Sequence, residues 1–492
     1  MSLRNHSLLN RTQVGLVALF TLAAGHIALG QAPASPGSTT AAPARPTAQD
    51  RSAIASASAA ERDRELKLLG ITAMQPGATA YDIGKPGNAN YDESKANPYP
   101  KLPPLLVMKD GTAVKTAVQW KKRRAEIQEM FAQDVYGRYP AHIPAVTWKV
   151  TGTEKMDVAG VPAVVKHLVG HTDNSAYPEI TVDIHADLVT PASAAGKRVP
   201  VIIGGGSLRA LTFRPSAPRA GQAPLHMLAM PENQPDSTKL LLEKGWGFVS
   251  RNLNEIQADN GAGLDKGIIG LVNHGQPRSL DDWGVLRAWA WTDSRILDYL
   301  LTDADVDSSK IGVTGHSRGG KEALLALADD TRFAIGYISS SGAGGADLYR
   351  RNYGETMGNL CGASEFHWFA GNFMRYAAQG HSADELPVDS HELIALVAPR
   401  AVFIGGGALI TDPKYAPGDA WQDAQGMFIA AAAASPAWEL LGAKGLGTST
   451  FPPMNTLIDT GDVAFRQHEW GHTPAPNWPY FIEFATKEFA RK

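Results

Sequence analysis

Apolar runs and helical patterns alternate along most of this chain. Residues 146–150 and 180–184 place apolar and polar side chains in alternation, which predicts strands with one exposed face. Further strands are predicted at residues 199–203, 246–250, 333–339 and 400–405, with a weaker candidate at residues 455–460. This order predicts an α/β fold in which helices cover both faces of an open, mostly parallel sheet.

Two segments have the period of a helix. In residues 282–301 the apolar side chains gather on one helix face. These side chains are Val285, Leu286, Trp289, Ile296, Leu297 and Leu300. Residues 478–491 predict a closing helix, and the chain contains no internal repeat.

A serine stands where one strand pattern meets a helix pattern. Residues 311–321 read Ile-Gly-Val-Thr-Gly-His-Ser-Arg-Gly-Gly-Lys and lead into an Ala/Leu-rich helix pattern. In a bare Gly-x-Ser-x-Gly sequence the serine is often an ordinary turn residue or a helix N-cap. The flanking strand and helix favour a nucleophile elbow, in which Gly315 and Gly319 leave room for a strained turn. Ser317 is therefore the candidate nucleophile.

A serine hydroxyl needs a base to become a nucleophile, and the base is usually a histidine that an acid orients. In α/β hydrolases the chain order is serine, acid, histidine, so the base is expected late in the chain. His468 and His472 lie there, in the run His-Glu-Trp-Gly-His. We favour His472 because it lies just before the closing helix, and His468 is the alternative.

The same five residues spell His-Glu-x-x-His, the signature of zinc peptidases. That signature needs a helix to turn both histidines toward one metal. Gly471, Pro474 and Pro476 are typical of a loop instead. We therefore set the zinc-peptidase interpretation aside and expect no metal and no organic cofactor.

The acid is less clearly marked. One usual position directly follows the strand predicted at residues 333–339, but Ser340 occupies it. The later candidates are Asp412, Asp419 and Asp423, each of which is equally compatible with a solvated loop or a turn. Asp419 lies in the loop after the strand at residues 400–405, and that loop can reach the histidine in this fold.

The first thirty residues have the pattern of an export signal. Arg4 and Arg11 precede an apolar stretch at residues 14–25, and residues 28–30 form a small-x-small cleavage site. An uncleaved membrane anchor is the alternative, but the apolar stretch is short for a span. We expect cleavage near Gln31 and an exported protein, periplasmic or secreted.

Composition narrows the domain organisation and the choice of partners. Residues 31–60 are rich in Ala, Pro, Ser and Thr and predict a disordered linker, which leaves residues 61–492 as one catalytic domain. The net charge of −3 gives no electrostatic reason to bind nucleic acid or an anionic membrane. Cys361 is the only cysteine, so no intrachain disulfide forms and stability must come from the core.

The chain resembles the glucuronoyl esterases over roughly residues 90–490. The matching segments are residues 282–284, 288–291, 294–295, 303–307, 315–321, 341–346, 350–355, 367–369, 386–391 and 398–400. The Ser-Arg-x-Gly-Lys run is the most specific of them. The resemblance implies an α/β-hydrolase fold, a three-layer sandwich with a nucleophile elbow.

The resemblance also implies roles for four further residues. Arg318 would support the oxyanion, Lys321 would hydrogen-bond sugar hydroxyls, and Glu355 and Trp421 would contact the sugar. Many family members carry the acid where this chain has Ser340. Others use the aspartate of an Asp-x-Trp loop, and resemblance to that version assigns the acid to Asp419.

The function implied by this resemblance is hydrolysis of esters between 4-O-methylglucuronic acid of xylan and lignin alcohols. One alternative is a broader carbohydrate acetyl esterase or carboxylesterase, because Arg318 and Lys321 do not exclude acetyl esters. Another is a carbohydrate-binding relative without activity, which the missing acid at position 340 favours and the retained Ser317 and His472 oppose. We expect a monomer whose partner is a glucuronoxylan or lignin–carbohydrate ester.

Overall fold

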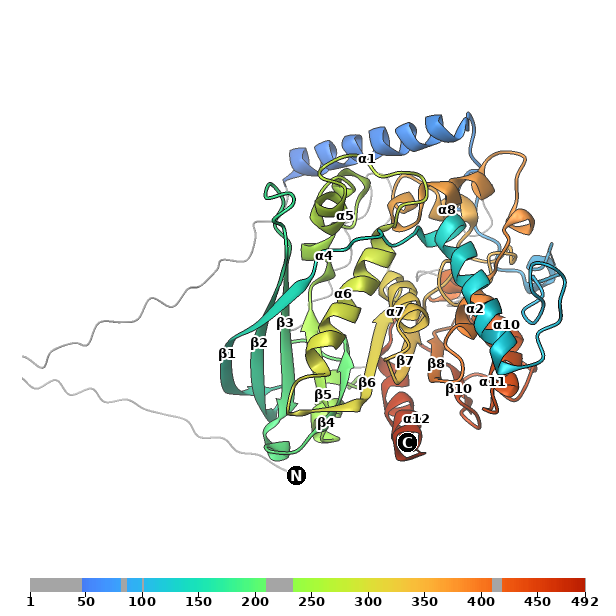
Figure 1. Ribbon diagram of the computed structural model, residues 1–492. Helices are drawn as coiled ribbons and strands as arrows, with labels where there is room; N and C mark the ends of the chain where they lie inside the picture. Colours follow the sequence, from blue (N-terminus) through green and yellow to red (C-terminus); the bar gives the residue numbers. More distant parts are fainter. Residues whose placement is uncertain (1–46, 81–85, 100, 209–232, 409–417, 492) are drawn as a thin grey trace, which may run out of the picture. The chain divides into compact units, whose positions relative to one another are not determined.

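Figure 1 shows the computed structural model, which describes residues 47–80, 86–99, 101–208, 233–408 and 418–491. All elements named below belong to the unit Ala48–Lys492. The predicted export signal and Asp412 lie outside the described residues.

The described part of the chain contains a ten-stranded sheet in the order β1-β2-β3-β5-β4-β6-β7-β8-β10-β9. Neighbouring strands are parallel through β5 (Gly247–Arg251), β4 (Val199–Ile203), β6 (Val306–His316), β7 (Ile335–Ser339), β8 (Ala401–Gly406) and β10 (Val463–Gln467). The antiparallel strands are β1 (Val146–Val158), β2 (Val161–Thr172), β3 (Asp183–Pro191) and β9 (Leu457–Ile458). Apolar residues of the central strands such as Val201, Ile311 and Ile335 are fully buried because both faces of the sheet are covered.

Side chains of the central strands alternate between two cores. Val201 and Ile203 pack in the core that includes residues of α6 (Val285–Leu300) and α7 (Arg318–Asp329). Ile202 points to the other face, where α3 (Ser237–Glu243) and α12 (Trp478–Arg491) supply the cover. The predicted three-layer sandwich with a mostly parallel sheet is therefore confirmed, as are the two amphipathic helices.

Further helices lie in the connections. They are α2 (Ala117–Phe131), α4 (Leu253–Ile256), α5 (Gly267–Val272), α8 (Met357–Leu360), α9 (Ser390–Ala395), α10 (Ala424–Ala434) and α11 (Pro436–Leu440). None of the helices in the described ranges is long and apolar enough to cross a membrane.

The structure corrects the linker prediction at its C-terminal end. Ala48–Leu69 form helix α1, although residues 48–60 were expected to be disordered. Alanine, glutamate and arginine are strong helix formers, and the low complexity of the segment hid that preference. Tertiary contacts also hold the helix, because Glu65 is fully buried and pairs with Arg278 at 2.8 Å. Figure 1 shows α1 as the long blue helix, which packs against the 3-10 helix Gly261–Gly263.

One strand prediction was misplaced and two strands were missed. The strand expected at residues 180–184 begins only at Asp183 and continues to Pro191, because its pairing with β2 runs from Asp183 to Pro191. Strands β2 and β10 had no counterpart among the predicted elements.

Candidate active site

Ser317 lies at the junction of β6 and α7, with φ 60° and ψ −129°. A non-glycine residue in this left-handed region is strained, and such strain concentrates at functional sites. Two backbone N–H groups, those of Gly320 and Lys321, bind the Ser317 carbonyl at 2.8 and 3.1 Å. The main chain therefore forms the strained turn that a nucleophile elbow requires.

The glycines that the turn requires are not the two that were expected. A Cβ on Gly315 would clash with the carbonyl of Gly319, so position 315 needs glycine. Gly319 has open space where its own Cβ would lie. Gly320 is the second crowded position, since its Cβ would lie 2.7 Å from the carbonyl oxygen of Ser339. The expectation that residue 319 is glycine for lack of room is therefore wrong.

The histidine favoured as base and the favoured aspartate meet in the structure. Nδ1 of His472 lies 2.6 Å from Oδ1 of Asp419, and the imidazole side chain is 29% exposed whereas the carboxylate is fully buried. Oδ2 of Asp419 accepts from the hydroxyl of Ser340 at 2.6 Å and from the N–H of Gly407. Ser340, at the usual acid position, thus supports the displaced carboxylate instead of replacing it.

Asp419 is held in its charged form. Burial opposes that form, but the charge and hydrogen bond of His472, with the bonds from Ser340 and Gly407, keep the pKa of Asp419 below its ordinary value. A buried carboxylate paired to one imidazole nitrogen fixes the tautomer and the orientation of the ring.

The ring of His472 is placed next to the elbow by a second histidine. His316, which directly precedes Ser317, lies with its ring centroid 4.2 Å from that of His472. Burial and the charge of His472 lower the pKa of His316 to about 3, so this neighbour is uncharged. Its Nδ1 is 3.0 Å from the hydroxyl of Ser339. No pattern in the sequence pointed to a role for His316.

The alternative histidine contacts the backbone of its own loop. His468 is buried, and its Nε2 lies 2.9 Å from the carbonyl oxygen of Thr473. Residues 468–472 form a loop between β10 and the short helix at Ala475–Asn477, so the helix that a zincin site needs is missing. Among the described residues, no cluster of three or more His, Cys, Asp or Glu side chains is arranged to hold a metal ion.

The three residues expected to face the sugar form one connected group. Nζ of Lys321 donates to Oε2 of Glu355 at 2.6 Å, and Nε1 of Trp421 lies 3.3 Å from Oε1 of Glu355. The backbone N–H of Glu355 also donates to the carbonyl of Trp421 at 3.0 Å. This group joins the segment after β7 to the loop that carries Asp419.

Lys321 lies deeper than the resemblance implied. Its side chain is 2% exposed, and besides Glu355 its ammonium donates to the carbonyls of Ser341 at 2.8 Å and Ala343 at 2.5 Å. Three partners use all three N–H donors. In this structure Lys321 therefore holds Glu355 in place, and no donor is left for a sugar hydroxyl.

Two carboxyl groups beside the site were not singled out in the sequence. Asp259 pairs with Nε of Arg318 at 2.9 Å. Glu365 lies near this pair and near Glu355, and Oε2 of Glu365 is buried without a hydrogen-bond partner. Burial, with the charge of Glu355, raises the pKa of Glu365 to about 8. No motif marked either residue, because both approach the site from distant loops.

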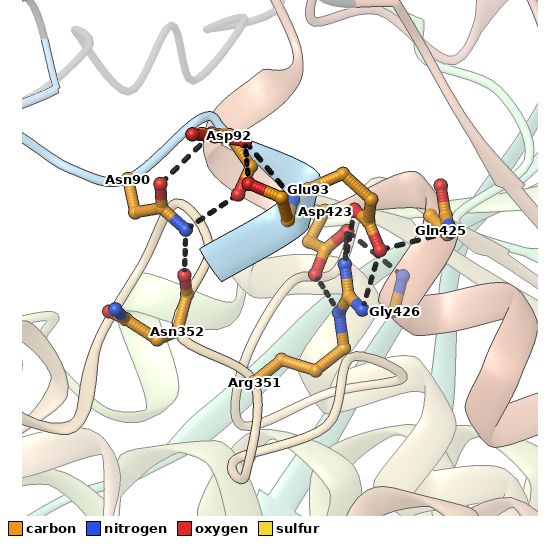
Figure 2. Close-up of polar contacts among 9 residues, drawn as sticks. Asn90, Asp92, Glu93, Arg351, Asn352, Asp423, Gln425 and Gly426 are labelled. Atoms are coloured by element: carbon orange, nitrogen blue, oxygen red, sulfur yellow. Dashed lines mark hydrogen bonds and ion pairs between the residues drawn. The ribbon is translucent and has the colours of Figure 1, made fainter. Parts of the chain in front are cut away.

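The third candidate acid, Asp423, pairs with an arginine. Figure 2 shows it on Arg351, whose Nε binds Oδ2 of Asp423 at 2.6 Å. Arg351 also pairs with Glu93 at 2.8 Å, and the backbone N–H of Gly426 donates to Asp423 at 2.9 Å. Both members of the pair are buried.

Known proteins are similar to this chain in sequence. The family model described as "Glucuronyl esterase, fungi" matches residues 234–442. Carbohydrate esterase MZ0003, from an unknown prokaryotic organism, is 31% identical over 441 residues, which cover 82% of this chain and 92% of the relative.

Two solved structures are similar over most of the chain. A glucuronoyl esterase from Teredinibacter turnerae is 38% identical and superposes with a TM-score of 0.76. The match covers 88% of this chain and all of that protein. An esterase from a marine bacterial metagenome, described as promiscuous, is 30% identical with a TM-score of 0.65, covering 82% of this chain and all of that one.

Proposed function

The chain belongs to the glucuronoyl esterase family, and we propose that it cleaves esters between 4-O-methylglucuronic acid of xylan and lignin alcohols. Membership makes it a carboxylic ester hydrolase that acts on glucuronoyl esters. The natural polysaccharide, the alcohol and the residue roles belong to the proposal. One observation carries the mechanism, namely that Asp419 and His472 meet at 2.6 Å beside the strained Ser317 turn.

The first half of the reaction transfers the uronoyl group to the enzyme. His472 removes the proton of the Ser317 hydroxyl, and the oxygen attacks the ester carbonyl carbon. The resulting oxyanion is stabilised by the backbone N–H and the guanidinium of Arg318. The tetrahedral intermediate collapses when His472 returns the proton to the leaving alcohol, which leaves a uronoyl ester on Ser317.

The second half releases the acid. His472 deprotonates a water molecule, which attacks the uronoyl ester, and Ser317 leaves as its hydroxyl. Asp419 keeps the imidazole oriented and stabilises its positive charge in both halves. Glu355 and Trp421 contact the sugar hydroxyls, and Lys321 fixes Glu355.

A broader esterase is the second candidate, and one observation favours it. The similar structure from a marine metagenome is described as promiscuous. Lys321 is also too buried to contact the sugar of a uronate ester directly. Specificity for the uronoyl group would then rest on Glu355 and Trp421 alone.

Hydrolysis of benzyl glucuronate and of p-nitrophenyl acetate tests both candidates. We expect the wild type to prefer the glucuronate, and both Ser317→Ala and Asp419→Asn to lose that activity. Activity on the acetate alone would replace the proposal with a general esterase. Xylan binding without turnover of either ester would identify a binding protein.

We also propose that the protein is exported and that residues 1–30 are removed. The basic and apolar pattern of that segment supports this, together with its small-x-small site. The catalytic domain proposed for residues 61–492 would then begin within α1, so a truncation at Ala48 should fold better than one at residue 61. N-terminal sequencing of the exported protein checks the cleavage. A first residue other than Gln31 would mean that cleavage occurs at another position.

A further inference from the structure

Arg318, the residue after the candidate nucleophile, is fixed in place although half of it is exposed. Its side chain is 51% exposed, yet its Nε forms an ion pair with Oδ2 of Asp259 at 2.9 Å. An exposed arginine without a partner samples many rotamers, so its charge is not aimed at any one point. The contact with Asp259 selects one orientation.

Asp259 is itself held by two buried donors. Its other oxygen, Oδ1, lies 3.0 Å from Nε2 of His367 and 2.6 Å from Nε1 of Trp368. Both donors belong to the short 3-10 helix Phe366–Trp368 and are almost completely buried. Because they occupy one oxygen, the second oxygen is left for Arg318.

The backbone that carries Asp259 is anchored two residues earlier. The side chain of Gln257 is fully buried, donates to the carbonyl of Gly263 at 2.7 Å and accepts from the N–H of Ile269 at 3.1 Å. Nε1 of Trp289 donates to the carbonyl of Gln257 at 2.9 Å. The carboxylate is therefore presented from a rigid base.

Asp259 stays charged in this setting. Burial opposes the charge, but the hydrogen bonds of His367 and Trp368 and the charge of Arg318 keep the pKa of Asp259 below its ordinary value. Burial lowers the pKa of His367, so its imidazole is neutral and donates from Nε2. The carboxylate thus receives two neutral donors and one cation.

We propose that Asp259 is the positioning residue that aims the guanidinium of Arg318 at the oxyanion of the reaction. This inference rests on the oxyanion role proposed above for Arg318. A guanidinium has five N–H donors, and the ion pair with Asp259 is made on the side of Nε. Both terminal nitrogens remain for the charge that develops on the carbonyl oxygen, and donors fixed in advance favour the transition state over the bound ester.

A double-mutant cycle tests the coupling between the two residues. We expect Arg318→Gln to lower kcat on benzyl glucuronate by about 10²–10³-fold, the loss typical of one oxyanion donor. Asp259→Asn should lower kcat by about 10- to 100-fold and leave KM within about twofold. The reason is that a catalytic group misplaced by about 1 Å can cost about 10²-fold in rate. The double variant should be no slower than Arg318→Gln, since the lost function is shared.

Each outcome separates the two claims. If Arg318→Gln leaves kcat unchanged, the proposed oxyanion role is wrong. If Arg318→Gln is slow but Asp259→Asn is as fast as wild type, or if the two losses multiply, the positioning inference is overturned. A faster Asp259→Asn would mean that the carboxylate weakens the cation instead of aiming it.

Two further variants keep the test independent of folding. Asp298→Asn is the matched control, because Asp298 is an exposed carboxylate that pairs with Arg332 at 2.7 Å, and its kcat should not change. Asp259→Glu keeps the charge but moves the oxygens by one methylene. It should lose kcat while its thermal unfolding midpoint stays at the wild-type value, and full activity of this folded variant would contradict the inference.

Discussion

Asp419 and Asp423 lie four residues apart in one loop and are both buried, yet they face different partners. Asp419 binds His472, the candidate base, whose ring is partly exposed. Asp423 binds Arg351, a permanent cation that is 3% exposed and that also pairs with Glu93. The sequence favoured Asp419 by its Asp-x-Trp context, but it gave no partner for either carboxylate.

The difference teaches that the partner, and not the burial, separates a chemical role from a structural one. A carboxylate beside an exposed imidazole can respond when the ring gains a proton. A carboxylate locked on a buried arginine has no partner that titrates near neutral pH. Burial and the charge of Asp423 also raise the pKa of Asp347 well above its ordinary value, so this further acid stays protonated behind the pair.

The largest expected effect comes from Asp419→Asn. An amide in place of the carboxylate favours the wrong tautomer of His472, and the comparable change in a serine protease lowers kcat about 10⁴-fold. Steady-state kinetics on benzyl glucuronate measure the loss. Asp423→Asn is the matched variant in the same loop and should keep far more activity, so similar losses in both variants would erase the distinction between them.

Arg351→Met should act on stability. It leaves Asp423 buried without its cation, and breaking a buried pair typically costs about 3–5 kcal/mol of unfolding free energy. Denaturant unfolding followed by circular dichroism measures this loss. At low temperature the folded fraction should retain a kcat close to that of the wild type. A loss of kcat at unchanged stability would mean instead that Arg351 contributes to catalysis.

Ser340→Ala should have a smaller, pH-dependent effect. Ser340 helps to lower the pKa of Asp419, and a lowered carboxylate pKa stabilises the fold at neutral pH. That contribution is complete above the unfolded pKa of about 3.9 and is lost as pH falls through the folded value. Without the hydroxyl the folded pKa rises, so acid unfolding should begin at a higher pH and neutral stability should fall by about 1–3 kcal/mol.

An acid titration followed by circular dichroism measures this shift. Ser435→Ala is the control, because Ser435 is a buried serine whose hydroxyl bonds backbone groups and no carboxylate. It should lower neutral stability with a smaller shift of the acid midpoint. If the midpoint pH of acid unfolding shifts no more in Ser340→Ala than in Ser435→Ala, Ser340 does not lower the pKa of Asp419.

The smallest effect is expected for Glu93→Gln. Glu93 pairs with Arg351 at 2.8 Å, but its side chain is 48% exposed, so solvent screens the pair. The change in unfolding free energy should lie within about 0.5 kcal/mol. A loss as large as that of Arg351→Met would mean that Glu93, and not Asp423, is the partner that Arg351 requires.

Local patterns were reliable where neighbours in sequence are neighbours in space. The elbow at Ser317, the helices α6 and α12 and the central strands all follow from short-range periodicity and turn chemistry. Helix α1 was missed because its composition resembles a linker, and only the burial of Glu65 against Arg278 shows what holds it.

The sequence by itself determined an α/β sandwich with a strained serine turn, a late histidine and a short set of aspartates. Those features are encoded in hydrophobic period, glycine placement and chain order. Only the tertiary structure decided that Asp419 faces His472, that Ser340 supports it, and that Asp259 reaches Arg318. Each of these contacts joins residues at least 53 positions apart, and no local preference specifies which distant carboxylate a folded loop brings to a given nitrogen.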